Sequence, residues 1–291
     1  MFKYKYKIPK TEIQTTYGSV CVDNIIFEPY EIEKILPDLV LEEDNLKHMF
    51  AETDLDKFKK RNIYKRFIPK EIISTDLDTY VMDCILKNKT FYSFLAEGIL
   101  GLVYRDIYGY DLAKGLIDIR DTLSDSHTGV DACMYNLQKN IIVLGEAKFY
   151  EDLKVGINAI IKDFTKKCIK NKLESLQSAA ENSAECYQIV IKNLSIEEYE
   201  EQTIDQFMNQ KIIFTGFVLH SEDDINNYSM PNFYDKYNIS AQQLKDNICK
   251  SLSIKGLPYD YQIILVHLPI KDKKSLIVKM IEESKIKLKN I

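Results

Sequence analysis

The sequence predicts an α/β fold in which a mixed central β-sheet is flanked by helices. Two short runs, at 211–220 and 261–267, are almost wholly apolar and have the length of strands, which is typical of central strands covered on both faces. Two stretches of helical character, at 90–104 and 155–178, precede them. Strands flanked by helices in this way indicate a sheet with helices packed on its faces.

The chain is expected to form a single elaborated domain over residues 1–291, because no change in composition marks a linker. The core of that domain would span about 90–180 and include strands near 211–220 and 261–268. Residues 1–89 would form an N-terminal elaboration of the core.

The elaboration begins with residues 2–8, where apolar residues alternate with lysines. This alternation predicts a half-buried strand at an edge of the sheet. Residues 30–90 have the pattern of helices and turns. The next stretch, 90–104, is apolar around most of its circumference, so we expect a buried helix. Its only charge is Glu97, and its glycines would let the helix lie close against the sheet; they are Gly98 and Gly101.

After this helix, residues 115–120 predict a short strand and 124–129 a loop. The loop leads into a β-hairpin over about 129–150, with its turn at 137–140. An amphipathic helix is expected from Val155 to about Ser178, since its isoleucines recur at helical spacing opposite lysines.

Composition limits the classes of function. The 291 residues carry a formal net charge of −5 and a pI near 5.6, which is not the profile of a general nucleic-acid coat. DNA binding would have to come from local patches or from a partner. Three basic segments are candidates, although each is predicted to be a solvated helix face; they are 57–66, 162–172 and 271–289. Only the first interleaves arginines and aromatic residues.

Several other classes of site lack their signatures in the sequence. No run approaches the roughly 18 apolar residues of a membrane span, so we expect a cytoplasmic protein without a membrane partner. The six cysteines include no C-x-x-C pair and are expected to be reduced core thiols. There is no G-x-S-x-G, Walker, G-x-G-x-x-G or H-E-x-x-H pattern. An activity that uses nucleotide energy would have to come from another protein.

The most informative pattern is D-x14-E-x-K, formed by Asp131, Glu146 and Lys148 in the predicted hairpin. With the turn at 137–140, an antiparallel hairpin pairs residues whose numbers sum to 277, which sets Asp131 opposite Glu146. Lys148 lies two residues beyond Glu146 and points to the same face. A slip of one residue in this register would separate the two acids.

Two directly opposed acids are destabilising unless something neutralises them. One solution is an ion pair in which Lys148 neutralises one acid at the end of the hairpin. The other is a hard cation such as Mg²⁺, held by Asp131 and Glu146, with the Lys148 ammonium positioning an attacking water. The paired spacing and the further acid in the preceding helix favour the catalytic interpretation.

That further acid is Glu97, the fourth candidate of the site. It would either complete the metal-binding acids or be satisfied by a core partner such as Arg105 or Arg120. The histidines have simpler interpretations. His127 is predicted in a turn, His48 in a helix with no nearby ligand, and two are expected to be half-buried strand residues, namely His220 and His267.

The order Glu97, Gly129-Val-Asp131 and Val143-Leu-Gly-Glu146-Ala-Lys148 resembles the PD-(D/E)xK nuclease superfamily. The proline of that motif is replaced here by Val130. The order of segments and the run Leu-Gly-Glu-Ala-Lys-Phe-Tyr are also similar to the HamA family, the nuclease subunits of the Hachiman antiphage defence system.

The resemblance implies a restriction-endonuclease-like core and a DNA endonuclease that works with a helicase partner, HamB. It also implies that Asp131, Glu146 and Glu97 bind Mg²⁺, for which Mn²⁺ can substitute, and that Lys148 acts on the attacking water. Two alternatives stay open at this point. The chain would be a non-catalytic interaction module that regulates a helicase, or a nuclease that cuts RNA.

Overall fold

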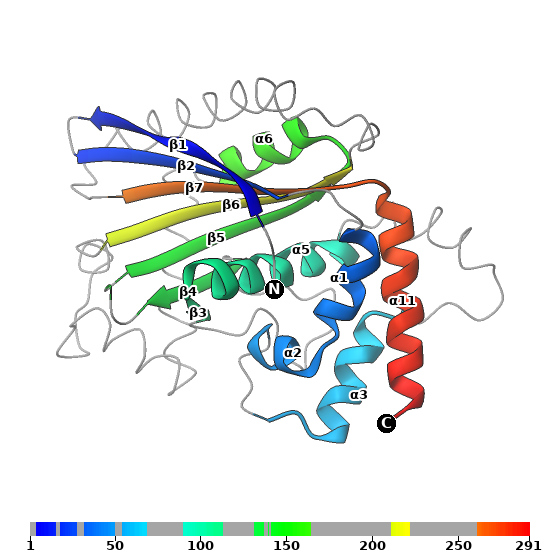
Figure 1. Cartoon of the computed structure of the whole chain (residues 1–291). Coiled ribbons are helices and arrows are strands. Elements are labelled where there is room, and N and C mark those ends of the chain that lie inside the picture. The colour runs from blue at the N-terminus through cyan, green and yellow to red at the C-terminus, as the bar shows by residue number, and fades with distance from the viewer. Residues whose placement is uncertain are drawn as a thin grey trace.

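A computed structural model describes most of the predicted core and parts of the N-terminal region (Figure 1). The described residues are 4–15, 18–27, 32–49, 54–68, 90–112, 131–136, 139, 141–163, 211–221 and 261–291. None of the helices in this part of the chain is long and apolar enough to cross a membrane.

The described strands form one seven-stranded mixed sheet in the order β1-β2-β7-β6-β5-β4-β3. The four central strands β2, β7, β6 and β5 run parallel, and antiparallel pairs extend both edges. The strands are β1 (Tyr4–Thr15), β2 (Gly18–Phe27), β3 (Asp111–Leu112), β4 (Ala132–Asn136), β5 (Ile141–Tyr150), β6 (Lys211–Ser221) and β7 (Tyr261–Ile270). The predicted mixed α/β class is confirmed.

Helices flank this sheet (Figure 1). They are α1 (Ile32–Val40), α2 (Glu43–Met49), α3 (Lys57–Arg66), α5 (Thr90–Val103), the π-helical turn η2 (Tyr104–Tyr108), α6 (Leu153–Asp163) and α11 (Lys273–Lys289). The C-terminal helix α11 packs against α1 and α3, and α5 packs against β4 and β5. Two helices of the N-terminal region, α1 and α3, therefore lie beside the C-terminal helix.

The long apolar runs behave as predicted. β6 and β7 are central strands, and residues 213–220 and 264–270 are buried. β1 is an edge strand, as expected, but it extends to Thr15. Its neighbour β2 was not predicted, because Asp23 and Asn24 interrupt its apolar run with residue types that strands disfavour.

The two strand histidines differ from the prediction. His220 and His267 are fully buried, not half-buried, because β6 and β7 are covered on both faces. Their rings are hydrogen-bonded across the two strands, with His220 Nε2 3.0 Å from His267 Nδ1. Burial, and secondarily the neighbouring His220, holds the pKa of His267 well below its ordinary value.

The glycines of α5 have a different role from the predicted one. A Cβ at Gly98 would lie 2.6 Å from the Met49 sulfur of α2, and the Gly101 carbonyl is 3.3 Å from His48 Nε2. These glycines face α2, not the sheet. The close approach of α5 to the sheet depends instead on Gly145 of β5, where an added Cβ would lie 2.8 Å from Leu100.

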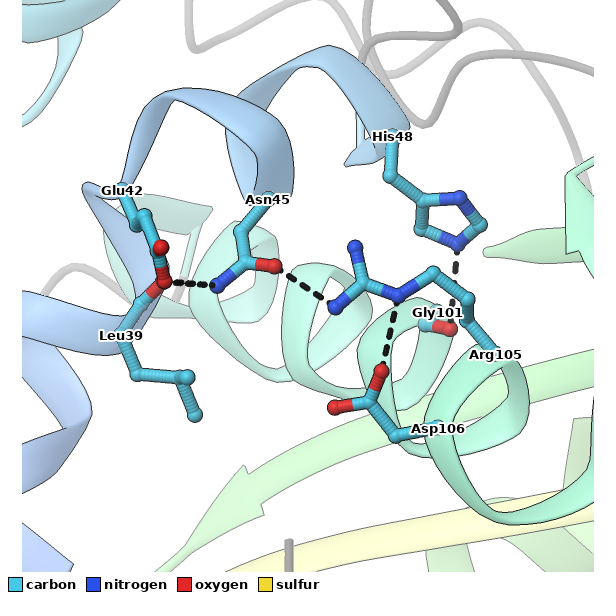
Figure 2. Close-up of polar contacts among 7 residues, drawn as sticks. All are labelled: Leu39, Glu42, Asn45, His48, Gly101, Arg105 and Asp106. Carbon is cyan, nitrogen blue, oxygen red and sulfur yellow. Dashed lines mark hydrogen bonds and ion pairs between the residues drawn. The ribbon is translucent and has the colours of Figure 1, made fainter. Parts of the chain in front are cut away.

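Polar contacts fix α2 against the C-terminal part of α5 and η2 (Figure 2). Arg105 donates to buried Asn45 at 2.6 Å and to Asp106 at 2.8 Å, and Asn45 in turn donates to the Leu39 carbonyl. Arg105 therefore helps to hold α2 against η2; which residue satisfies Glu97 stays a prediction.

Some predicted segments lie outside the described residues. These are the strand at 115–120, the loop at 124–129 with His127, Arg120, and the part of the 155–178 helix after Asp163. The described part of that helix, α6, starts two residues before the predicted position.

Candidate catalytic and metal-binding site

The hairpin has the predicted register. Ala132 pairs with Gly145 and Asn136 with Ile141, so paired residue numbers sum to 277. Asp131 immediately precedes β4 and therefore lies opposite Glu146. The sequence places these residues correctly because an even hairpin turn fixes the register of both strands.

Three predicted site residues contact one another in the hairpin. The Asp131 carboxylate accepts a hydrogen bond from the Ala147 backbone N–H at 2.8 Å, and the same oxygen lies 3.5 Å from Lys148 Nζ. Lys148 Nζ is 3.0 Å from Glu146 Oε2. Glu146 is 2% exposed, so its charge is held in a largely water-free environment where paired charges interact strongly.

A third carboxylate, which the sequence analysis did not include, completes the surroundings of Lys148. Asp163 at the end of α6 lies 2.8 Å from Lys148 Nζ, closer than either hairpin acid. In the sequence it follows Lys162 in an amphipathic helix and has the pattern of a solvated position. The short connection from β5 to α6 could have indicated the position of Asp163, because a helix that directly follows a strand packs back onto the sheet.

The electrostatics of this cluster follow from one ammonium among three carboxylates. Burial alone would lower the pKa of Lys148, but the charges of Asp131 and Asp163, and their hydrogen bonds, outweigh it and raise that pKa above its ordinary value. Lys148 therefore stays protonated at neutral pH. The formal charges of the four groups sum to about −2 when the acids are ionised, so the cluster favours a further cation.

The faces of β5 separate Glu97 from this cluster. Glu146 pairs with Gly216, where an added Cβ would meet Ile160 of α6, so Glu146 and Lys148 face α6. Gly145 faces Leu100 of α5. Glu97 is buried in that same helix at 7% exposure. The structure brings Asp131, Glu146 and Lys148 together, while Glu97 comes from the helix on the opposite face; its role at the site stays a prediction.

The donor set suits a hard divalent cation in chemistry and number. Mg²⁺ takes oxygen ligands, and it is commonly bound by one or two carboxylates together with waters and substrate phosphates. Asp131 and Glu146 provide two such carboxylates on one face. Within the described residues, no three His, Cys, Asp or Glu side chains are grouped closely enough to hold a metal by themselves. Asp131 and Glu146 therefore fit the carboxylate part of a Mg²⁺ site; that an ion binds there stays a prediction.

The family model HamA matches residues 31–284, nearly the whole chain. No curated protein matches the sequence. The matched range contains the hairpin cluster, α5 and every described element after β2 except the C-terminal end of α11. The chain therefore belongs to the HamA family, a family of Hachiman antiphage defence proteins.

Proposed function

We propose that this protein is a metal-dependent DNA endonuclease, the effector subunit of a two-protein antiphage complex with a helicase. The observation that carries the proposal is the hairpin register, which sets Asp131 opposite Glu146 with Lys148 on the same face. This arrangement is the one expected for a PD-(D/E)xK core. Membership of the HamA family supports the defence role.

The roles of the residues follow from their chemistry. Asp131 and Glu146 would hold Mg²⁺, or Mn²⁺ in its place. The bound ion supplies charge neutralisation at the scissile phosphate and a lower pKa for its water. Lys148 is protonated, so its ammonium donates hydrogen bonds and can orient the attacking water oxygen. The Ala147 backbone N–H holds the Asp131 carboxylate in place.

A helicase partner fits the composition of the chain. The sequence has no nucleotide-binding loop and carries a net charge of −5. Acidic proteins attract DNA weakly over long range, since DNA affinity arises largely from neutralised phosphates. Delivery of DNA by a HamB-like partner would remove this disadvantage.

The test is DNA cutting by the double variant Glu146→Ala/Lys148→Ala. We expect cutting of plasmid DNA in Mg²⁺, measured with the partner present, to fall at least about 100-fold, since catalytic groups typically contribute factors of this size. Protection of cells from phage should be lost as well. Circular dichroism and co-purification with the partner should show that fold and assembly are retained.

A matched control removes one negative and one positive charge at nearby exposed positions. Glu151→Ala/Lys154→Ala changes an exposed acid and an exposed base that follow β5, and it should cut DNA at the wild-type rate. Undiminished cutting by a folded Glu146→Ala/Lys148→Ala protein would refute the proposal. Parallel digestion of RNA of the same sequence decides whether RNA is also a substrate.

The ion pairs of Lys148 favour a second candidate function. Its contacts with Glu146, Asp131 and Asp163 would by themselves stabilise the hairpin of a non-catalytic module that regulates a helicase. A module of this kind would cut neither RNA nor DNA. Phage protection would survive substitutions that keep the hairpin folded. The surplus negative charge of the cluster favours the metal-dependent nuclease over the module.

A further inference from the structure

Helix α3 is the most basic described element of an acidic chain. Residues 57–66, Lys-Phe-Lys-Lys-Arg-Asn-Ile-Tyr-Lys-Arg, include six bases and no acid. The whole chain has a net charge of −5. Positive charge is therefore concentrated on this helix, which packs beside α11 at the periphery of the fold (Figure 1).

The helix divides its residues between two faces. Ile63 and Tyr64, with Phe67 just after the helix, are buried and join the hydrophobic core. Lys57, Phe58, Arg61 and Lys65 are exposed, and Phe58 is exposed to 72%. At 3.6 residues per turn these four positions fall within an arc of about 100°. The exposed strip, defined as these four residues, thus combines three cations with one aromatic ring.

The ion pairs among the described residues do not include the cations of the exposed strip. On the other side of α3, Lys60 pairs with Glu43 of α2 at 2.5 Å. Lys57, Arg61 and Lys65 make no ion pair with any other described residue. The helix dipole favours a cation at the C-terminal end, which accounts for Lys65, but it disfavours one in the first turn, where Lys57 lies. Fold stability alone does not explain that charge.

We propose that the exposed strip of α3 binds a nucleic-acid strand, with its three cations on the phosphates and Phe58 stacked against a base. Four residues of helix rise about 6 Å, so Lys57, Arg61 and Lys65 form an evenly spaced row. Single-stranded nucleic acids are bound by such combinations of cations and exposed aromatic rings. An acidic protein surface would pair with the cations but would not require the ring. The choice of nucleic acid as partner rests on the proposed function.

The experiment measures binding of a fluorescent single-stranded DNA by anisotropy, in EDTA to prevent cutting, over a range of salt concentrations. The variant Lys57→Gln/Arg61→Gln/Lys65→Gln should bind at least about tenfold more weakly. The slope of log affinity against log salt concentration should become smaller in magnitude by about 2, since each neutralised phosphate contributes about 0.7 for single strands. Phe58→Ala should weaken binding by about tenfold, as expected for one lost base stack, with an unchanged slope.

The control variant Lys139→Gln/Lys154→Gln/Lys289→Gln removes three exposed lysines that do not share a face of one helix. It should bind more tightly than the α3 variant. Equal losses in the two variants, or no binding by the wild type at 50 mM salt, would overturn the proposal. The proposal would also be overturned if the α3 variant lost binding to a polyglutamate peptide but bound DNA as the wild type does. That result would identify an acidic protein partner.

Different experiments would contradict the nuclease proposal and the proposal for the exposed strip. Glu146→Ala/Lys148→Ala should bind the strand as the wild type does while it no longer cuts. Wild-type binding by the α3 variant contradicts only the exposed strip, whereas cutting by the double variant contradicts only the catalytic site.

Discussion

At the scale of residues, Lys148 is the centre of the candidate site. Its ammonium lies within 3.5 Å of three carboxylates from β5, from the segment before β4 and from α6. The spacing of the sequence predicts two of these partners, because residues of one hairpin are related by a simple register. Asp163 could not be found in this way, since its position depends on how α6 packs across β5.

Asp163 is expected to act through Lys148. Asp163→Asn removes a carboxylate that raises the pKa of Lys148, so that pKa should fall. A lysine with a raised pKa contributes its ion-pair stability below its unfolded pKa and loses it as pH rises through the folded value. In the variant this loss, and the loss of cutting that needs the ammonium, should begin at lower pH. At neutral pH, cutting should decrease about three- to tenfold, as expected for a partly exposed charged hydrogen bond.

The measurement is the pH profile of DNA cutting between about pH 7 and 10.5. Asp163→Glu keeps the carboxylate and should restore the alkaline limb, and Glu151→Gln serves as an exposed control that should leave the profile unchanged. An Asp163→Asn profile identical to that of the wild type would show that Asp163 does not position Lys148.

At the scale of elements, the site depends on the contact between α5 and the hairpin. Gly145 immediately precedes Glu146 in β5 and lies against Leu100 of α5 and Ala132 of β4. The sequence indicates a buried helix before the hairpin, and that prediction is confirmed. The glycine that allows α5 to approach the sheet closely was predicted wrongly, because packing with α2 decides which side of α5 faces the sheet. The position of Glu97 relative to the hairpin acids depends on the same contact.

Gly145→Ala should therefore destabilise the fold. Its Cβ would lie 2.8 Å from Leu100 Cδ2 and 3.2 Å from the Ala132 Cβ, and such overpacking typically costs about 1–3 kcal/mol. The free energy of unfolding in urea is the measurement. Leu100→Ala in the Gly145→Ala background should lose less stability than Leu100→Ala alone, because the added methyl group fills part of the space. Additive losses in the double variant would contradict the predicted contact.

At the scale of the whole molecule, one sheet joins segments from all parts of the chain. The central parallel strands were predictable because burial on both faces leaves continuous apolar runs, as in β6 and β7. The pairing of β2 with β7 was not predictable, since the two strands are more than 230 residues apart in sequence. Nothing in the local pattern of Gly18–Phe27 indicates a distant parallel partner. The division into a core and an N-terminal elaboration stays a prediction.

We propose that the acids around Lys148 form a divalent-cation site and not only an ion-pair network. This proposal is tested most directly by thermal melting of the wild type and of Asp131→Asn/Glu146→Gln, each with and without millimolar Mg²⁺ or Mn²⁺. A ligand at ten times its Kd stabilises the folded state by about 1.4 kcal/mol, so the wild-type midpoint should rise by a few degrees. The variant should show no such rise. A wild-type midpoint that does not respond to either metal, or an equal rise in the variant, would contradict the account.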